Sequence, residues 1–259
     1  PVQGLFGLSY ELSVALATFV AMTLAALGAL YSYHRLPESH RDDKTLDIVR
    51  IVANIFGLLS SLVLGLMVSQ ASGDFGDVEK AVRSYATDIV MLDRSLRDLG
   101  PDAMPMRDEL RGYIATVVAM RDVERPALPA ENKTAEATLH DIRDRLAGLK
   151  LSDPQMLADR DAAKAEVDTL LRARWAIIDR AQGSVPFPLI VALVLWLSLT
   201  MACYGYRAPR NTVVVVGFVL SSALLSAAIY MILDMGKPFD GPIQASSDPF
   251  VRALEEIQR

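Results

Sequence analysis

Hydrophobic residues occur in long blocks along this chain rather than being spread evenly. Four blocks contain no Asp, Glu, Lys or Arg, and they cover residues 12–34, 51–73, 181–206 and 211–233. An α-helix rises about 1.5 Å per residue, so each block is long enough to cross about 30 Å of hydrocarbon. We therefore predict four transmembrane helices, at about 12–34, 51–73, 187–206 and 211–233.

The stretch between the second and third blocks, residues 74–184, has a different pattern. Its apolar residues recur at alternating spacings of four and three, which is typical of helices that pack along a heptad seam. The first series is Val78, Val82, Tyr85, Ile89, Leu92, Leu96 and Leu99. Three further series follow: Met106, Leu110, Tyr113, Val117 and Met120; Ala135, Leu139, Ile142, Leu146 and Leu149; and Val167, Leu170 and Ile177.

These series predict a soluble domain of two long and two shorter antiparallel helices. The seam either packs this intrachain bundle or associates with a second copy. We expect the motifs "GDFGD" and "GSVPFP" to separate the domain from the second and third transmembrane helices. Ser152, followed by Pro154 and Gln155, resembles a capping box that starts the fourth helix.

The segment after residue 233 combines helix breakers with one amphipathic run. Pro238, Gly241 and Pro242 exclude regular structure. Ser247 then caps a final helix whose apolar face is Phe250, Leu254 and Ile257. We expect this tail to dock on the protein or to lie at the lipid interface.

The chain is therefore expected to be all-α, with two transmembrane helices on each side of a soluble helical bundle. The predicted domains are 1–73 with the first helix pair, 74–184 as the soluble bundle, 185–233 with the second pair, and 234–259 as the tail. The first block lacks a preceding basic segment and a small-residue cleavage site, so we expect an anchor rather than a signal peptide.

The composition is typical of a membrane protein and bears on whether the chain binds nucleic acid. Hydrophobic residues make up 52% of the chain, and the net charge of −5 with no basic tail gives no support for nucleic-acid binding. The single cysteine, Cys203, excludes an intrachain disulfide. We expect a multipass protein of a bacterial inner membrane.

Catalytic signatures are missing from the sequence. His34, His40 and His140 are far apart, and none has a neighbour at metal-ligand spacing. No Gly-rich phosphate loop is present. We therefore expect neither an enzyme nor a bound cofactor or metal.

The second block carries a stripe of small and polar residues. Asn54, Gly57, Ser61, Gly65 and Ser69 are spaced three or four apart, so they share one helix face. Such a stripe lets helix backbones approach closely. Alternatively, several copies of this helix surround an axis, where small side chains leave room for water and Leu, Val or Phe neighbours form a constriction. The residues alone leave both interpretations open.

Two acidic residues border the blocks. Asp74 follows the second block, and Asp234 ends the fourth. Each is a candidate for a pore mouth that attracts cations, and the alternative for Asp234 is an interfacial pair with Lys237.

Loop charges bear on the orientation in the membrane. Basic residues of short loops usually stay in the cytoplasm. The loops at 34–50 and 207–210 contain Arg35, Arg41, Lys44, Arg50, Arg207 and Arg210. This count favours an extracytoplasmic domain, but basic residues also flank the membrane on the domain side.

Several stretches resemble a bacterial membrane family described as bestrophin-like. They include "IFGLLSSLVLGLMVSQA", "YRAPRNTVVV" and "AAIYMILDMGKPFDGPIQASSDPFVRAL". Bestrophins proper are pentameric ion channels with two helices, a helical cytoplasmic domain, two more helices and a tail, and their second helix lines the pore. The resemblance implies a pentamer, a cytoplasmic domain and pore lining by Asn54, Phe56, Gly57, Ser61, Gly65 and Ser69.

The sequence thus predicts a homo-oligomeric channel that conducts small inorganic ions passively, because no charged group lies within the blocks to couple to transport. Ion selectivity is left open, and the domain's excess of 21 acidic over 17 basic residues favours cations. The alternative is a non-conducting scaffold or sensor whose domain binds a partner.

Overall fold

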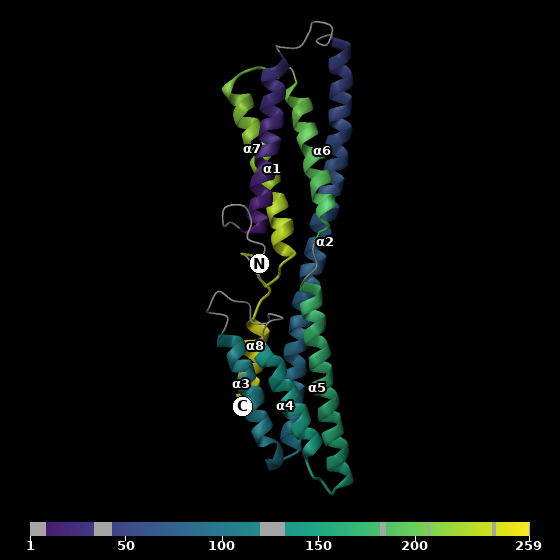
Figure 1. The fold of residues 1–259 in the computed structure, drawn as a ribbon, viewed down its shortest axis with the longest axis vertical. Helices are drawn as coiled ribbons and strands as arrows, with labels where there is room; N and C mark the ends of the chain where they lie inside the picture. Colours follow the sequence, from purple (N-terminus) through teal and green to yellow (C-terminus); the bar gives the residue numbers. More distant parts are fainter. Residues whose placement is uncertain are drawn as a thin grey trace. The chain divides into compact units, whose positions relative to one another are not determined.

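The computed structural model describes residues 9–33, 43–119, 133–181, 185–206, 208–239 and 242–258, without the side chains of residues 43–46 and 133–135. Every regular element in these ranges is helical, so the all-α prediction is confirmed (Figure 1). The histidines at 34 and 40, the basic residues at 35, 41 and 207, and Met120 lie outside the described residues, as does the side chain of Ala135.

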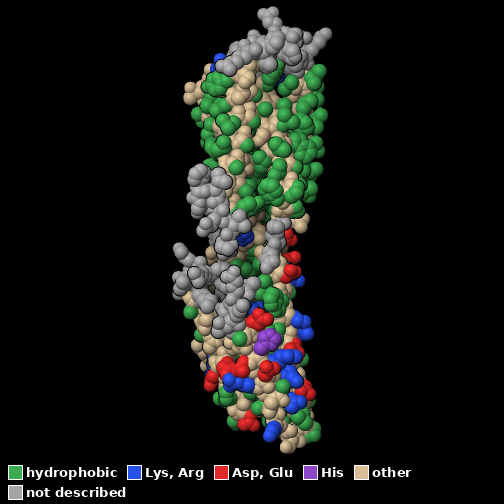
Figure 2. Space-filling model, viewed as in Figure 1, with side chains coloured by type: hydrophobic (Ala, Val, Ile, Leu, Met, Phe, Trp, Pro, Cys, Tyr) green, Lys and Arg blue, Asp and Glu red, His purple; other side chains and the backbone are tan. Residues whose placement is uncertain are grey.

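Within the described ranges, four helices are long and apolar enough to cross a membrane. They are α1 (Tyr10–Ser32), the first part of α2 (Asp43–Asp98), α6 (Phe187–Gly205) and α7 (Thr212–Met235). The prediction of four transmembrane helices is confirmed. On the face that Figure 2 shows, hydrophobic side chains predominate over these helices, whereas most charged side chains lie on the rest of the chain.

Polar residues begin two of these helices. The backbone N–H of Leu12 donates to the Ser9 hydroxyl at the start of α1, at 3.4 Å. At the start of α7, the N–H of Val214 donates to the Asn211 side chain at 2.8 Å. Both contacts satisfy backbone donors that the first helical turn leaves open.

Helix α2 is longer than the sequence pattern predicts. It runs for 56 residues without interruption, so the expected break at "GDFGD" is wrong. Glycine costs about 1 kcal/mol in a helix interior, which is not enough to end a helix that is packed on both sides of it. Ala71 and Val78, before and after this motif, are both buried.

The chain divides into two compact units, each described by itself. Unit 1 comprises residues 1–72 and 184–235, and unit 2 comprises residues 73–183 and 236–259.

In unit 1, α1 contacts both α6 and α7 (Figure 1). Its core contains Met22 of α1, Met67 and Ala71 of α2, and apolar residues of α6 and α7. Helices α1 and α6 approach closely at Gly205, which faces the backbone of Ala26 so that a Cβ at Gly205 would overlap the Ala26 carbonyl.

Unit 2 is a bundle of the second part of α2, α3 (Met104–Ala119), α4 (Lys133–Gly148), α5 (Pro154–Ala181) and α8 (Asp248–Gln258). All seven residues of the first predicted series are buried, with at most 2% exposed. They share one core with the described residues of the other series, so the heptad seam packs the intrachain bundle.

The fourth helix of the bundle begins one residue later than the capping box predicts. Pro154 is its first residue, and the N–H of Gln155 donates to the Asp153 carboxylate at 3.1 Å. The Gln155 side chain binds Asp159 instead of reaching back toward Ser152. Asp153 is therefore the cap, because its carboxylate accepts a backbone N–H at least as well as a serine hydroxyl does.

Helix α8 docks on unit 2. Phe250, Ala253 and Ile257 are buried in its core, with the Phe250 ring 6.1 Å from that of Tyr85. At the other end of α8, the Arg111 side chain donates to the Ile257 carbonyl at 3.1 Å. Of the two predicted positions for the tail, docking on the protein is therefore the one observed.

Unit 2 also contains buried polar groups. The Arg107 guanidinium of α3 binds the Asp93 carboxylate of α2 through two hydrogen bonds of 2.7 and 2.9 Å. The hydroxyls of Tyr85 and Tyr113 are 2.7 Å apart. Burial raises the pKa of Tyr113, and the hydrogen bond with Tyr85 and the fully buried Arg174 of α5 oppose this effect only in part. Pairing is what makes buried polar groups tolerable in such a core.

Candidate functional site

The membrane part of α2 has a buried face and an exposed face. The buried face carries Ala53, Ser60, Met67 and Ala71, with 1%, 2%, 7% and 4% of each residue exposed. Steps of seven and four residues return to the same side of an α-helix, so these positions form one line along α2. This line is the side on which α2 packs in unit 1.

The predicted stripe lies mainly on the other face. Asn54, Ser61, Gly65 and Ser69 are all exposed, and Gly57 is half-buried. A Cβ added at Gly65 would meet nothing within 4 Å. Within one protomer, the four exposed members of the stripe are therefore not a packing seam, and we refer to Asn54, Gly57, Ser61, Gly65 and Ser69 as the small-residue face.

Phe56 is separated from the small-residue face. At about 100° per residue, it lies well around the helix from Ser61. Its ring packs edge-on against Trp196 of α6, with 6.2 Å between the ring centroids. The structure therefore does not bring Phe56 together with the other residues that the resemblance assigns to the pore.

A ridge of leucines runs beside the small-residue face. Leu58, Leu62 and Leu66 are 71%, 57% and 63% exposed. Exposed apolar surface of this kind contacts lipid or another protein chain. The same helix thus presents a polar, small-residue strip and an apolar strip next to each other.

One neighbour of the small-residue face comes from α6. The Tyr204 hydroxyl donates to Oδ1 of Asn54 at 3.3 Å, and Tyr204 is 46% exposed. A Cβ at Gly57 would lie 3.7 Å from the same hydroxyl oxygen. Sequence reasoning missed Tyr204 because it lies 150 residues from Asn54 and reads as an ordinary aromatic residue near a helix end.

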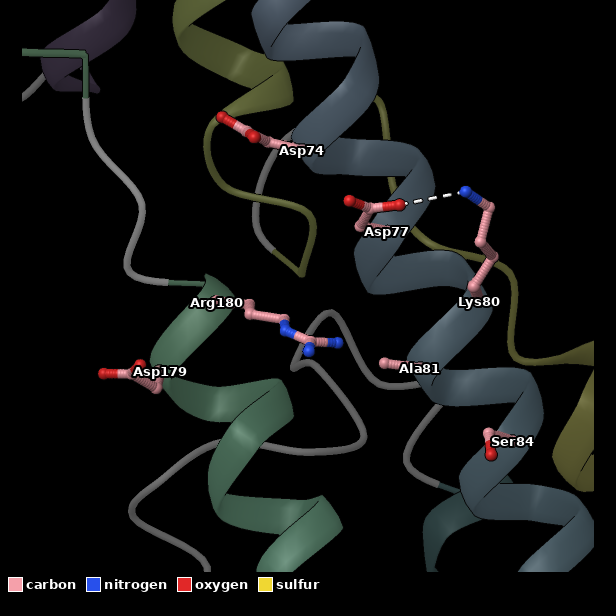
Figure 3. A pocket seen from close by; sticks show the side chains of 7 residues that line it. All are labelled: Asp74, Asp77, Lys80, Ala81, Ser84, Asp179 and Arg180. Carbon is pink, nitrogen blue, oxygen red and sulfur yellow. Dashed lines mark hydrogen bonds and ion pairs between the residues drawn. The ribbon is translucent and has the colours of Figure 1, made fainter.

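Asp74 belongs to unit 2, where it is exposed and lines a pocket of about 660 Å³ between α2 and α5. Figure 3 shows Arg180 of α5 pointing toward α2, and Asp77 joined to Lys80. That ion pair is 2.9 Å long. Acidic and basic groups alternate in the pocket, so it does not present a field of one sign.

Asp234, the other predicted mouth residue, is 3% exposed near the end of α7. The structure thus places it inside unit 1, away from the surface of the protomer. Its burial within the protomer does not favour direct contact with a passing ion.

The described residues contain no group of three or more His, Cys, Asp or Glu side chains that could hold a metal ion. His140 is on the surface of α4, 3.8 Å from Glu136. The small-residue face presents hydroxyl, amide and backbone groups in a segment without charged residues. Such groups are suited to contact with water or hydrated ions.

Comparisons with known proteins agree with this architecture. A crystal structure of a bacterial bestrophin homolog from Klebsiella pneumoniae, with one tryptophan replaced by alanine, is 15% identical to this chain with a TM-score of 0.65. The match covers 96% of this chain and 97% of that chain. A second variant of the same homolog, with isoleucine replaced by threonine, is 15% identical, with a TM-score of 0.62 and coverage of 95% and 99%.

At such low identity these structures establish the shared fold alone. No curated protein matches the chain. The family model described as Bestrophin-like domain matches residues 13–250, which include α1 from its fourth residue, the other three apolar helices, the helical bundle and the first residues of α8. The chain therefore belongs to the bestrophin-like family.

Proposed function

We propose that this protein is an oligomeric ion channel of a bacterial inner membrane. Several copies surround an axis, five as the resemblance to bestrophins implies, and ions pass along the axis without coupling to an energy source. The small-residue face of α2 lines the pore, and Asp74 lies at one mouth. We leave Phe56 and Asp234 out of the proposed lining, because Phe56 packs against Trp196 and Asp234 is buried within the protomer.

The observation that carries this proposal is the exposure of the small-residue face. Small residues that serve close packing within a protomer are expected to be buried between helices. Here Ser60 is buried while Ser61, the next residue, is exposed. A polar strip on the outside of a membrane helix is costly against lipid, and an axis shared by several copies removes it from lipid.

Passive conduction suits this face better than active transport. The segment 51–73 contains no Asp, Glu, Lys or Arg. Ion-coupled transporters and proton relays usually carry ionisable groups inside the membrane. Water in a pore lined by serine and glycine leaves a passing ion partly hydrated.

Purified protein in a planar bilayer tests the proposal. We expect currents above those of an empty bilayer, at both voltage signs and in several salts. Absence of current in all these conditions would instead favour the non-conducting scaffold or sensor.

The mass of the complex in detergent gives an independent test. An axial pore requires an oligomer, and the proposal expects a defined multiple of the 28.3 kDa chain. A monomer would exclude any pore formed around an axis.

A further inference from the structure

The contact between Tyr204 and Asn54 has a role that the pore proposal does not include. We propose that Tyr204 of α6 is part of the pore wall and holds the Asn54 side chain in one orientation. This inference rests on the proposed function, because it assigns a positioning residue to the same ion pathway.

The Tyr204 hydroxyl lies beside the small-residue face of α2. Tyr204 is the α6 residue whose hydroxyl meets α2 at two members of the small-residue face, Asn54 and Gly57. It is 46% exposed, and Asn54 is exposed as well. Its hydroxyl is thus at the edge of the strip that lines the pore rather than in the core of unit 1.

Gly57 lies next to the Tyr204 hydroxyl. Gly57 has no side chain, and the Tyr204 hydroxyl oxygen lies 3.7 Å from where its Cβ would be. The next atom near that position is the Thr200 methyl carbon, at 3.9 Å. At these distances an added Cβ would make ordinary van der Waals contact, so Gly57 borders the Tyr204 hydroxyl without blocking its approach to Asn54.

The hydrogen bond from Tyr204 orients the Asn54 carboxamide. The carboxamide of asparagine has an acceptor, Oδ1, and a donor group, Nδ2, on the same carbon. The Tyr204 hydroxyl donates to Oδ1. Within the described part of the chain, Nδ2 has no hydrogen-bond partner, so its N–H groups are available to the exposed side. In each protomer this end of the pore then offers N–H donors, which favour anions over cations relative to a carbonyl oxygen.

Tyr204→Phe removes the hydroxyl and keeps the ring. A neutral hydrogen bond biases an equilibrium by about two- to tenfold, so without it the carboxamide rotates and presents Oδ1 part of the time. We expect the ratio of Na⁺ to Cl⁻ permeability, obtained from reversal potentials in a NaCl gradient, to rise by about twofold or more. The mass of the complex and its thermal stability should stay close to those of the wild type.

A double-mutant cycle with Asn54→Ala separates positioning from direct lining. If Tyr204 acts through the carboxamide, Tyr204→Phe has no further effect on the permeability ratio in the Asn54→Ala background. Tyr206→Phe is the matched control, because that ring packs on Tyr33 of α1 at 5.1 Å, and it should leave the ratio unchanged.

Two results would overturn the inference while leaving the channel proposal intact. One is wild-type current with a permeability ratio that Tyr204→Phe does not move. The other is a Tyr204→Phe effect of equal size with and without Asn54. Absence of any wild-type current would remove the channel proposal itself, and the inference with it.

Discussion

The ion pair of Asp93 with Arg107 joins α2 to α3 inside unit 2. Both side chains are nearly inaccessible, at 2% and 7% exposed, and Arg97 adds a contact of 3.5 Å to Asp93 from the surface. A buried charge that loses its partner keeps its desolvation cost. The pair therefore makes the packing of α2 on α3 sensitive to either residue.

Asp93→Ala is expected to destabilise unit 2 by about 3–5 kcal/mol, since it leaves the Arg107 guanidinium buried without this carboxylate. Chemical unfolding in detergent, followed by circular dichroism, measures the loss. Asp141→Ala is the control: it breaks an ion pair with Arg145 whose side chains are about half exposed, and should cost less than about 1 kcal/mol. Equal losses in the two variants would contradict the expectation.

Tyr113 makes stability depend on alkaline pH. Burial raises the pKa of its hydroxyl above the ordinary value of 10.0. The folded state therefore favours the neutral phenol, and this contribution to stability is complete below pH 10 and is lost as the pH rises toward the folded-state pKa. We expect the free energy of unfolding to fall above about pH 10.

Tyr113→Phe should make that fall shallower, because phenylalanine has no proton to lose. Unfolding measured from about pH 8 to about pH 11.5 gives the slope. Tyr31→Phe, at an exposed tyrosine of α1, serves as the comparison. An identical slope for wild type and Tyr113→Phe would rule out this residue as a cause.

Neither residue-scale feature could be predicted from the sequence. Asp93 and Arg107 are 14 residues apart on two helices, and each looks like one more charge on a solvated helix face. The apolar series was predicted well because burial follows a period that is visible in one helix, whereas pairing depends on how two helices meet.

At the scale of single elements, Gly205 sets how closely α6 approaches α1. A Cβ at this position would overlap the backbone carbonyl of Ala26, which cannot move aside as a flexible side chain can. Gly205→Ala is therefore expected to lower the thermal stability of unit 1 by an amount typical of overpacking, about 1–3 kcal/mol.

The matched control is Gly217→Ala in α7, where an added Cβ would meet nothing within 4 Å. Alanine also favours a helix over glycine, so this change should be neutral or slightly stabilising. A Gly205→Ala protein as stable as Gly217→Ala would show that α1 and α6 are not in tight contact.

The extent of α2 shows where local patterns mislead at this scale. Gly73 and Gly76 indicate a break in the helix. However, an isolated glycine lowers the stability of a helix interior by only about 1 kcal/mol. Ala71 is buried in the core of unit 1, and Val78 is buried in the core of unit 2. The packing of α2 over many turns stabilises the helix more than these two glycines destabilise it. The residues around "GDFGD" alone do not reveal this difference.

At the scale of the whole molecule, the two neighbouring serines of α2 give opposite predictions. Ser61→Leu is expected to reduce single-channel conductance while the oligomer persists. The larger leucine side chain would narrow the proposed pore, and it would not disturb the core of unit 1 because position 61 is exposed. Gly65→Leu should do the same, since its surroundings are open.

Ser60→Leu is the contrast, because Ser60 is 2% exposed. Leucine there must enter a packed core, so stability or assembly should fail before conductance is affected. Current recordings combined with the mass of the detergent complex distinguish the two patterns. Loss of assembly in Ser61→Leu, with normal current in Ser60→Leu, would reverse the assignment of the two faces.

The candidate site was only partly predictable for a similar reason. Spacing places Asn54, Ser61 and Gly65 on one face, but it does not say whether that face is buried. Phe56 entered the predicted lining through family resemblance, and the Trp196 contact shows that it lies on another side. Tyr204 required the fold, because only the packing of α6 on α2 brings it to Asn54.

Helix α8 has a consequence for how the chain is synthesised. Its residues Phe250 and Ile257 complete the core of unit 2, yet they follow α6 and α7 in the chain. A ribosome that has already made α2 to α5 must therefore deliver two hydrophobic helices to the translocon before this core can close. During that interval Tyr85 lacks the cover of the Phe250 ring, and exposed apolar surface of this kind is prone to aggregation.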